Sequence, residues 1–414
     1  MMITVQEAHR LIRQSLSLTG TEEMPLGRLQ GRVLAADITA PFPMPRFTNA
    51  AMDGFALRLE DIRHASEGSS VKLMVTLKIP AGVSCPLPVA AGCCAEIMTG
   101  APLPEGADTV VAFEETSGFG TPFVEIYKAP KEGANIRRCG EEVEAGETLL
   151  CKGQNLSPAE IAVLASFGFA SAPVMIIPRV SIVTVGDELR QPGLDLSGGQ
   201  IYNSNSVMLE AACRSIGIEP AGIRHAPDDR DALRETLAHS IAGADMVITA
   251  GGISTGEYDF VQEELSALGV RKKFWSVAQK PGKPLYFGLT SAGKPVFSLP
   301  GNPVSTLVCF VEYCIPALYA LQGRADPVKL QAVLAGQFPS DRKRHRFLFG
   351  TLWVEEGRLL CRIAPKVESH MITSAAGSNC IIESAPSTDP LQAGSEVTCT
   401  MLPWAGPPAQ AFIC

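Results

Sequence analysis

Residues 179–321 alternate short apolar segments with helical patterns, and this alternation constrains the fold more than any other feature of the chain. The segments VSIVTV, DMVITA and KPVFSLP have the continuous apolar character of strands that are buried on both faces. Helical patterns lie between them, one from Asn203 to Ser215 and another that we expect Asp228 to cap. Strands alternating with helices of this length predict βαβ units, and therefore a doubly wound parallel sheet.

The regions on either side of this segment have a different pattern. Residues 71–150 carry short apolar segments between Gly and Pro turns, which favours a β-rich domain, and from about Asp326 strand-like segments again follow one another without helices. We therefore predict a multidomain α/β plus β protein. The predicted domains are an N-terminal helical and linker domain (1–45 and 146–177), an inserted β-rich domain (46–145), the doubly wound domain (178–325) and a C-terminal β domain (326–414).

The composition argues against several classes of protein. A net charge of −8 disfavours a general nucleic-acid binder, and the basic run Arg342–Arg346, taken alone, is best explained as a solvated loop or a strand rim. The start, MMITVQEAHRLIRQSL, lacks the apolar core of a secretory leader, and we find no apolar run long enough to span a bilayer. The twelve cysteines are scattered, so without a secretory leader we expect reduced thiols in a cytoplasmic protein. From the net charge and the apolar runs, we expect neither nucleic acid nor a membrane as partner.

The loop ITAGGISTGEYDF, residues 248–260, combines two kinds of chemistry. Gly251, Gly252 and Ser254 follow an apolar strand, and exposed backbone amides in such a loop suit an anion. Asp259 in the same loop would repel a phosphate unless a divalent cation lay between them. Mg²⁺ commonly uses one or two carboxylates together with substrate phosphates, so the loop predicts an anion bound with its metal.

Acidic residues also follow other strands of the predicted sheet. Glu188 comes after VSIVTV and Asp228 follows the next strand, so both should lie at the edge that binds ligands in open parallel sheets. Each acid has an ordinary alternative. Asp228 and Asp259 would serve equally well as helix caps, and Asp187-Glu188 as a solvated turn.

Two further loops suit anions. In QKPGKPL, Lys280 and Lys283 flank a Pro-Gly turn that concentrates positive charge, although two exposed hairpin lysines are an equally good explanation. In SLPGNPVSTL, Gly301 and Asn302 lead into a long helix whose first amides suit an oxyanion or phosphate. Ordinary helix capping by Asn302 is the alternative, and Pro316 should kink this helix.

Taken in order, these loops and three N-terminal segments resemble one family. AAMDGFAL, IMTGAPLPEGADTVV, NIRRCGEEVEAGETL, TVGDEL, TAGGISTGEYDF, KPGKP and SLPGNPVS are similar to the motifs of the molybdopterin molybdenumtransferase family, the MoeA-type enzymes related to the E domain of gephyrin. The resemblance covers essentially the whole chain. It implies elongated homodimers, with a doubly wound molybdopterin-binding domain, a β-rich inserted domain and a small C-terminal β-barrel.

The resemblance also implies an activity. Such enzymes take adenylylated molybdopterin and molybdate, use Mg²⁺ as cofactor, release AMP and deliver molybdenum to the dithiolene sulfurs. Their cleft lies between the doubly wound domain of one subunit and the N-terminal region of the other, and contact with the upstream adenylyltransferase is a further expectation. Alternatives are molybdopterin adenylyltransferase itself, a non-catalytic scaffold of the gephyrin E-domain type, or a Mg²⁺-dependent nucleotide pyrophosphatase.

Site residues follow from the same resemblance. Family members often have Asp at Glu142, Lys or Arg at Ser276, and a basic residue at Phe349, a charge that Arg344 or Arg346 would supply after a small shift. The expected catalytic residues are Asp53, Thr99, Glu142, Glu188, Asp228 and Asp259, with Asp228 and Asp259 as Mg²⁺ ligands. The expected substrate-binding residues are Gly251, Gly252, Ser254, Lys280, Lys283, Gly301, Asn302, Ser305 and Ser369.

Overall fold

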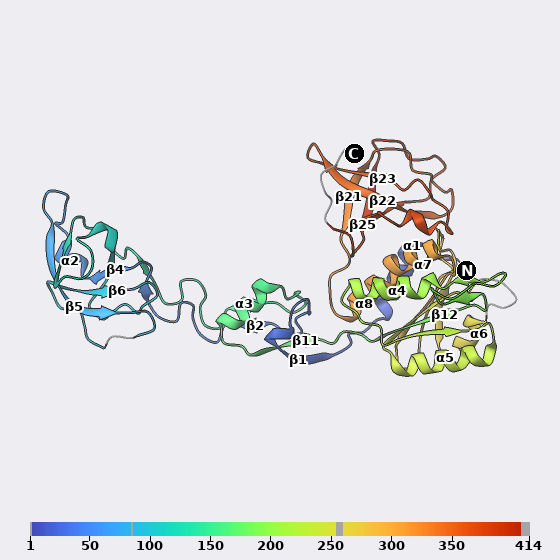
Figure 1. Cartoon of the computed structure of the whole chain (residues 1–414), viewed down its shortest axis with the longest axis horizontal. Coiled ribbons are helices and arrows are strands. Elements are labelled where there is room, and N and C mark those ends of the chain that lie inside the picture. The colour runs from blue at the N-terminus through green and yellow to red at the C-terminus, as the bar shows by residue number, and fades with distance from the viewer. Residues whose placement is uncertain (1, 84–85, 254–259, 407–414) are drawn as a thin grey trace. The chain divides into compact units, whose positions relative to one another are not determined.

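The computed structural model describes residues 2–83, 86–253 and 260–406, and these fall into two compact units (Figure 1). Unit 1 comprises Met1–Ala35, Gly153–Ser157 and Ser171–Cys414, and unit 2 comprises Ala36–Lys152 and Pro158–Ala170. The four predicted domains are a finer division of the chain, and their boundaries stay a prediction.

The core of unit 1 is a sheet with the strand order β15-β12-β16-β20-β19-β17. The first four strands of this order are parallel, which confirms the predicted doubly wound sheet. The other two add an antiparallel edge beside β20 that the sequence analysis did not predict. The strands are β12 (Val180–Val185), β15 (Gly222–Ala226), β16 (Met246–Ala250), β17 (Arg271–Trp275), β19 (Tyr286–Leu289) and β20 (Pro295–Leu299).

Alternate residues of the parallel strands face opposite layers of helices, as the pleat of a strand requires. Ile182 and Ile248 pack with α1, α4 and α7, whereas Val183 and Val247 pack with α5 and α6. The sheet therefore has a buried core on both faces, which explains its continuous apolar strands. The helices are α1 (Val5–Ser15), α4 (Ser204–Ser215), α5 (Arg230–Gly243), α6 (Val261–Ala267) and α7 (Pro303–Cys309).

Two predicted helix caps have different outcomes. Thr4 and Glu7 form the predicted capping box of α1. The prediction that Asp228 caps α5 is wrong, because Asp229 occupies the cap position and its Oδ1 accepts a hydrogen bond from Ala232 N at 2.9 Å. Consecutive aspartates are chemically equivalent as caps, so the sequence did not distinguish them. The shift leaves the Asp228 carboxylate free of any capping role.

The helix that begins at Pro303 runs to Leu321, but it is not a uniform α-helix. A π-helical turn, η3 (Phe310–Cys314), separates α7 from α8 (Ile315–Leu321). Pro316 is the second residue after this turn and lacks the amide that would close a regular bond to Glu312 O. The predicted kink therefore takes the form of a π turn. The helix is long and apolar enough to cross a membrane, but 83% of its most apolar window is buried inside the molecule, as in the core helix of a globular domain.

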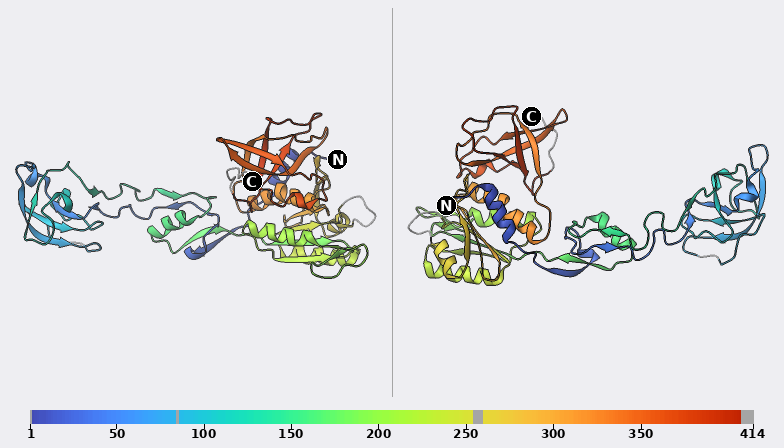
Figure 2. Two further views of the ribbon diagram at one scale, coloured as in Figure 1. Left: turned by 45° about the horizontal axis from the view of Figure 1, so that its top comes forward. Right: turned by 180° about the vertical axis from the view of Figure 1, so that it is seen from behind.

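The C-terminal strands of unit 1 close into the small barrel that the resemblance implied. They pair in the order β22-β23-β21-β25-β24, and β24 returns to pair with β22. The barrel (red in Figure 2) lies against the helical layer that contains α7, and Phe347 and Phe349 join the same core as Phe310. The strands are β21 (Lys329–Leu334), β22 (His345–Glu355), β23 (Arg358–Ile363), β24 (Cys380–Ser384) and β25 (Glu396–Met401), preceded in the loop before β24 by the short helix η4 (Ile372–Ser374).

A short strand joins the barrel to the α/β part of unit 1. β18 (Gln279–Lys280) pairs in parallel with β22, so that Gln279 lies opposite His345 and Lys280 opposite Arg346. Smaller sheets complete this unit. They are β1 (Thr21–Pro25) with β11 (Ser171–Met175), and β13 (Leu189–Arg190) with β14 (Ile201–Tyr202), while η1 (Leu26–Arg28) is a single helical turn.

Unit 2 is β-rich, as predicted for this part of the chain. Its main sheet has the strand order β7-β4-β6-β5-β8, and its core includes Phe55 and Leu57. The main strands are β4 (Gly54–Leu57), β5 (Val71–Ile79), β6 (Cys93–Ile97), β7 (Thr109–Ala112) and β8 (Phe123–Ile126). The smaller elements are β2 (Ile38–Thr39) with β10 (Thr148–Leu150), β3 (Asn49–Ala50) with β9 (Ile136–Arg137), α2 (Leu59–Ile62), η2 (Phe113–Glu115) and α3 (Pro158–Ser166).

The packing of α1 predicts an acid-sensitive step in the stability of unit 1. The His9 ring stacks on Tyr313 with centroids 4.9 Å apart, and burial, with Lys329 nearby, lowers the pKa of His9 from 6.5 to about 4. The unfolded chain then binds the proton more readily, so this stabilisation is complete above pH 6.5 and is lost as the pH falls toward 4.

We expect His9→Phe, which keeps the ring contact without a titrating group, to lose less stability on acidification than the wild type. The difference in unfolding free energy between pH 7 and pH 4 should shrink by at most about 3 kcal/mol. Urea unfolding at both pH values, followed by circular dichroism, measures it. Parallel losses in the two proteins would show that His9 is not the titrating group.

Candidate functional site

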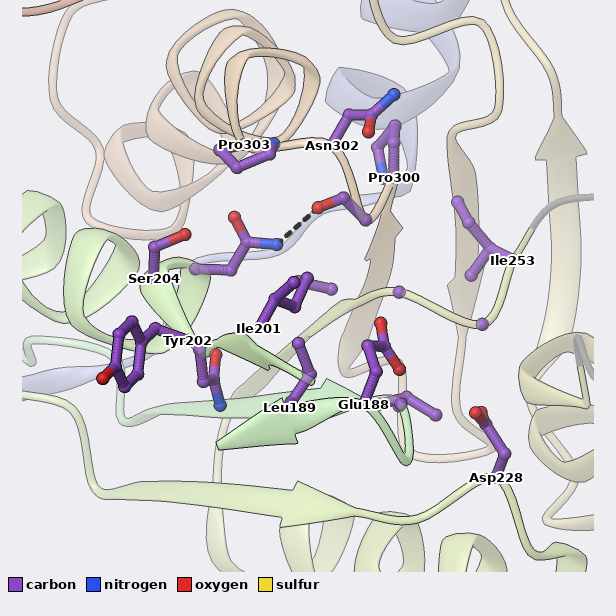
Figure 3. A pocket seen from close by; sticks show the side chains of 18 of the residues that line it. Glu188, Leu189, Ile201, Tyr202, Ser204, Asp228, Ile253, Pro300, Asn302 and Pro303 are labelled. Carbon is purple, nitrogen blue, oxygen red and sulfur yellow. Dashed lines mark hydrogen bonds between the residues drawn. The ribbon is translucent and has the colours of Figure 1, made fainter. Parts of the chain in front are cut away.

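A cavity of about 560 Å³ opens at the carboxyl edge of the parallel strands of unit 1 (Figure 3). The loops after β12, β16 and β20 supply most of its wall, as expected for a ligand site in a doubly wound sheet. We call it the strand-end cavity. Its lining includes Gly186, Glu188, Asp228, Gly251, Gly252, Ile253, Pro284, Pro300, Gly301 and Asn302, together with Leu189 and residues 201–205.

Two of the predicted acids lie in this cavity. Figure 3 shows Glu188 and Asp228 on one side of it and Pro300, Asn302 and Pro303 on the other. The Asp228 carboxylate accepts a hydrogen bond from Asp187 N at 3.1 Å, and Asp228 N donates to Asp187 Oδ1 at the same distance. This reciprocal pair fixes the loop, and both cavity carboxylates lack a cationic partner among the described residues.

Glycine is required at both positions of the turn after β16. Gly251 has a φ of +97°, and a Cβ there would lie 2.4 Å from Val185 O. Gly252 has a φ of +65°, and its Cβ would lie 2.8 Å from Val261 Cγ2. The turn therefore packs against the end of β12 with bare backbone, which brings it into the cavity wall beside Glu188.

Asn302 occupies the cap position of α7, but its side chain makes no capping hydrogen bond. Instead Asn302 Nδ2 donates to Ser369 Oγ at 3.2 Å, which links the C-terminal region to the cavity wall. The first-turn amides of α7 are thus not satisfied by Asn302 and can face an anion. Ser305 is 4% exposed within α7 and does not line the described cavity.

A second cavity, of about 540 Å³, is strongly basic, and we call it the basic cleft. Asp341 binds Arg344 at 2.7 Å, and this hydrogen bond lowers the pKa of Asp341 to about 2. The side chains of Lys283, Arg342 and Lys343 have no carboxylate partner among the described residues. The cleft is lined by Met2, Lys283, Ser340, Asp341, Arg342, Lys343 and Arg344.

The two cavities meet at one turn of the chain. Lys283 lines the basic cleft and Pro284, the next residue, lines the strand-end cavity, so the two spaces share a wall. Residues 342–346 span the loop before β22 and the start of that strand, in agreement with the predicted loop or strand rim. The cleft that Arg342, Lys343 and Arg344 line with Lys283 was not predicted from the sequence. The contact point directly follows the segment Lys280–Lys283, which we call the lysine turn.

Lys280 lies beside a buried arginine at the start of β22. Lys280 is paired in register with Arg346, which is 7% exposed and whose Nε has no hydrogen-bond partner among the described residues. Burial lowers the pKa of the Arg346 guanidinium. Phe349 is 3% exposed in the core, whereas Arg344 precedes β22 and Arg346 lies at its start, so a charge supplied by either arginine stays a prediction.

The structure brings Asp53 and Thr99 together in unit 2. Because Gly54 pairs with Ile97 between β4 and β6, the residues at the adjoining ends of these strands meet. Asp53 Oδ1 accepts hydrogen bonds from Thr99 N and Thr99 Oγ1, each at 2.7 Å, and these bonds lower the pKa of Asp53. Glu142 is exposed, and within the described residues no contact joins it to this pair; its amide donates to Met44 O at 3.0 Å.

Sequence reasoning did not identify the wall formed by residues 201–205. Asn203 Nδ2 donates to Thr184 Oγ1 at 2.8 Å, and Asn205 Nδ2 donates to Gly301 O at 2.7 Å. These bonds tie the start of α4 to the ends of β12 and β20. The polar run Asn203-Ser204-Asn205 ahead of an apolar helix was the available signal, but it also reads as ordinary helix capping.

The residues of this site fit a divalent ion. Glu188 and Asp228 offer carboxylate oxygens opposite amides that suit phosphate, and Mg²⁺ typically completes such a site with water and substrate oxygens. Within residues 2–83, 86–253 and 260–406, no three His, Cys, Asp or Glu side chains converge as a full protein cage. The predicted ligand Asp259 and the predicted binding residue Ser254 lie outside the described residues.

Matches to known protein families extend along most of the chain. Residues 3–168 match the MoeA N-terminal region (domain I and II), residues 181–320 a "probable molybdopterin binding domain", and residues 331–402 the MoeA C-terminal region (domain IV). Molybdopterin molybdenumtransferase 2 of Mycobacterium tuberculosis is 36% identical over 403 residues, covering 96% of this chain and 98% of the relative. The chain belongs to the molybdopterin molybdenumtransferase (MoeA) family.

Other members of the MoeA family agree with this placement. The molybdopterin molybdenumtransferase of Haemophilus influenzae is 33% identical over 96% of this chain and 98% of its own. A crystal structure of the molybdopterin biosynthesis MoeA protein from Pyrococcus horikoshii aligns with a TM-score of 0.82 at 30% identity, covering 97% of this chain and all of that one. The MoeA fold is therefore common to the full length of these chains.

We expect Gly251→Ala to weaken anion binding in the strand-end cavity, because a Cβ at this φ must displace the turn from Val185 O. Strain of this kind costs about 1–3 kcal/mol, which corresponds to roughly tenfold or more in pyrophosphate affinity. Isothermal titration with Mg²⁺-pyrophosphate measures it.

Gly243→Ala is the matched control, since Gly243 lies in α5 with open space around the added methyl group. It should bind pyrophosphate as the wild type does. Equal pyrophosphate affinities in all three proteins would show that the Gly251-Gly252 turn does not contribute to anion binding.

Proposed function

We propose that this protein inserts molybdenum from molybdate into adenylylated molybdopterin, with Mg²⁺-dependent release of AMP, in the biosynthesis of the molybdenum cofactor. The observation that carries the proposal is the shared wall between the two cavities. One cavity offers amides and carboxylates, which suit a diphosphate with its metal ion. The other is basic and suits a tetrahedral dianion such as molybdate.

The strand-end cavity would bind the phosphoanhydride. The Gly252 amide and the start of α7 would face the phosphate oxygens, while Glu188 and Asp228 would hold Mg²⁺. The Gly251 amide is already bonded to Leu299 O at 3.1 Å and shapes the turn instead. When bound, this ion neutralises charge on the phosphates and on the departing AMP. Asn205, held by Gly301 O, keeps the β20 loop in place for the substrate.

The basic cleft would bind molybdate. Lys283, Arg342 and Lys343 supply positive charge without carboxylate partners, and Lys280 in β18 pairs in register with Arg346, two residues after the cleft residue Arg344. Since consecutive residues, Lys283 and Pro284, line the cleft and the strand-end cavity, the oxyanion would be held close to the bound substrate. Ser369, bonded to Asn302, is a second polar contact at this boundary.

Several parts of the proposal rest on family membership. We expect a homodimer in the cytoplasm, contact with the upstream adenylyltransferase, and roles in the reaction for Asp53, Thr99, Glu142 and Asp259. The hydrogen-bonded, ionised form of Asp53 is consistent with a catalytic carboxylate. Ser254, Gly301 and Ser305 remain expected contacts to the substrate phosphate.

A reaction with purified components tests the function. Adenylylated molybdopterin, Mg²⁺ and molybdate should yield AMP and molybdenum-loaded cofactor in equal amounts. AMP without metal incorporation would leave a nucleotide pyrophosphatase, whereas turnover of molybdopterin and ATP would indicate the adenylyltransferase. A protein inactive in every arm would favour a non-catalytic scaffold.

We expect Asp228→Asn to lower kcat for AMP release by about 100-fold or more, because it removes a charge that would hold the metal ion against the phosphates. Asp229→Asn is the matched control: the neighbouring residue caps α5, and asparagine caps a helix about as well as aspartate. Steady-state AMP release by the two variants decides the role, and equal rates would exclude Asp228 from it.

A further inference from the structure

Gln279 is fully buried at 0% exposure and stands directly before the lysine turn. Its Nε2 donates to Pro281 O and to Gly282 O, each at 3.1 Å, and lies 3.4 Å from Cys309 Sγ. Its Oε1 accepts a hydrogen bond from the Tyr313 hydroxyl. One side chain therefore holds two consecutive carbonyls of the turn and is itself held by the long helix.

The backbone of the turn lies directly against these groups. Gly282 has a φ of +85°, and a Cβ there would lie 2.6 Å from Cys309 Sγ and 2.8 Å from Gln279 Nε2. The turn has no room to shift toward α7 and is pinned by Gln279 from moving away. Its conformation is thus determined by a polar contact in an otherwise apolar core.

The partners of Gln279 come from the irregular part of the helix. Cys309 is the last residue of α7, and Tyr313 lies in the π-helical turn η3 and is 0% exposed. Tyr313 is held in turn by its stacking contact with His9. An amide buried this deeply is costly to leave unpaired, so the contact is a specific feature of the fold and not incidental packing.

This arrangement sets the positions of both lysines. Lys283 O accepts a hydrogen bond from Val277 N at 2.9 Å, and Lys280 is paired in register with Arg346. With the carbonyls of Pro281 and Gly282 held between them, the two lysine Cα atoms are fixed relative to each other. Lysine side chains lose considerable freedom when they bind an ion, and a fixed backbone reduces that cost.

We propose that Gln279 is a positioning residue for oxyanion binding: it holds the lysine turn so that Lys280 and Lys283 present their ammonium groups together to molybdate. The inference rests on the proposed function, because it takes the oxyanion to bind at these lysines. Gln279 does not touch the substrate and acts through the turn alone.

Gln279→Met tests the inference, since methionine keeps the volume and removes the hydrogen bonds. We expect the Kd for molybdate, measured by calorimetry, and the KM for molybdate to rise about tenfold, because a shift of about 1 Å in binding groups costs up to roughly 100-fold. The KM for adenylylated molybdopterin should stay unchanged. Gln322→Met is the matched control, a glutamine 5% exposed at the C-cap of the same long helix, where it bonds Leu318 O at 2.9 Å.

Hydrogen exchange gives a readout that needs no ligand. The peptide 276–286 should exchange faster in Gln279→Met than in the wild type or in Gln322→Met. Unchanged exchange, an unchanged Kd for molybdate, or equal losses for both substrates would overturn the inference. A wild type that binds no molybdate would instead overturn the proposed oxyanion site, and with it the role of Gln279.

Discussion

The parallel register of β12, β16 and β20 is the constraint on which the rest of the site depends. Parallel strands end at one edge, so three loops that are far apart in sequence meet there without any further device. Side-chain hydrogen bonds then hold these loops in place. Asn203 reaches Thr184, and Asn205 reaches Gly301 O, so the wall of the strand-end cavity is held from the core outward.

Positive and negative side chains are clustered in different parts of unit 1. The chain is acidic overall, with a net charge of −8, yet cations gather where β22 and the lysine turn approach each other. Carboxylates lie at the other side of the turn, in the strand-end cavity. In the proposed reaction, two anions that repel each other in solution would be held close together, one with a metal ion as counter-charge and the other with side-chain cations.

Local patterns in the sequence were sufficient for much of this structure. The alternation in 179–321 predicted the parallel sheet, Thr4 and Glu7 predicted the start of α1, and the loops after three strands predicted the cavity. What failed depended on tertiary contacts. Asp228 and Asp229 are equivalent as caps by sequence, and strand direction at β17 and β19 has no local signature. The basic run became a cleft because the barrel fold placed it beside Lys283.

The pairing of β18 with β22 has a consequence for how this architecture could change over time. Through that pairing the barrel shares main-chain hydrogen bonds with the α/β part of unit 1, and Lys280 is one of the paired residues of β18. A gene fragment ending before the barrel would leave β18 without its ladder partner and would expose the apolar surface that Phe347 and Phe349 cover. Deleting the terminal barrel would therefore also remove the backbone support of the lysine turn.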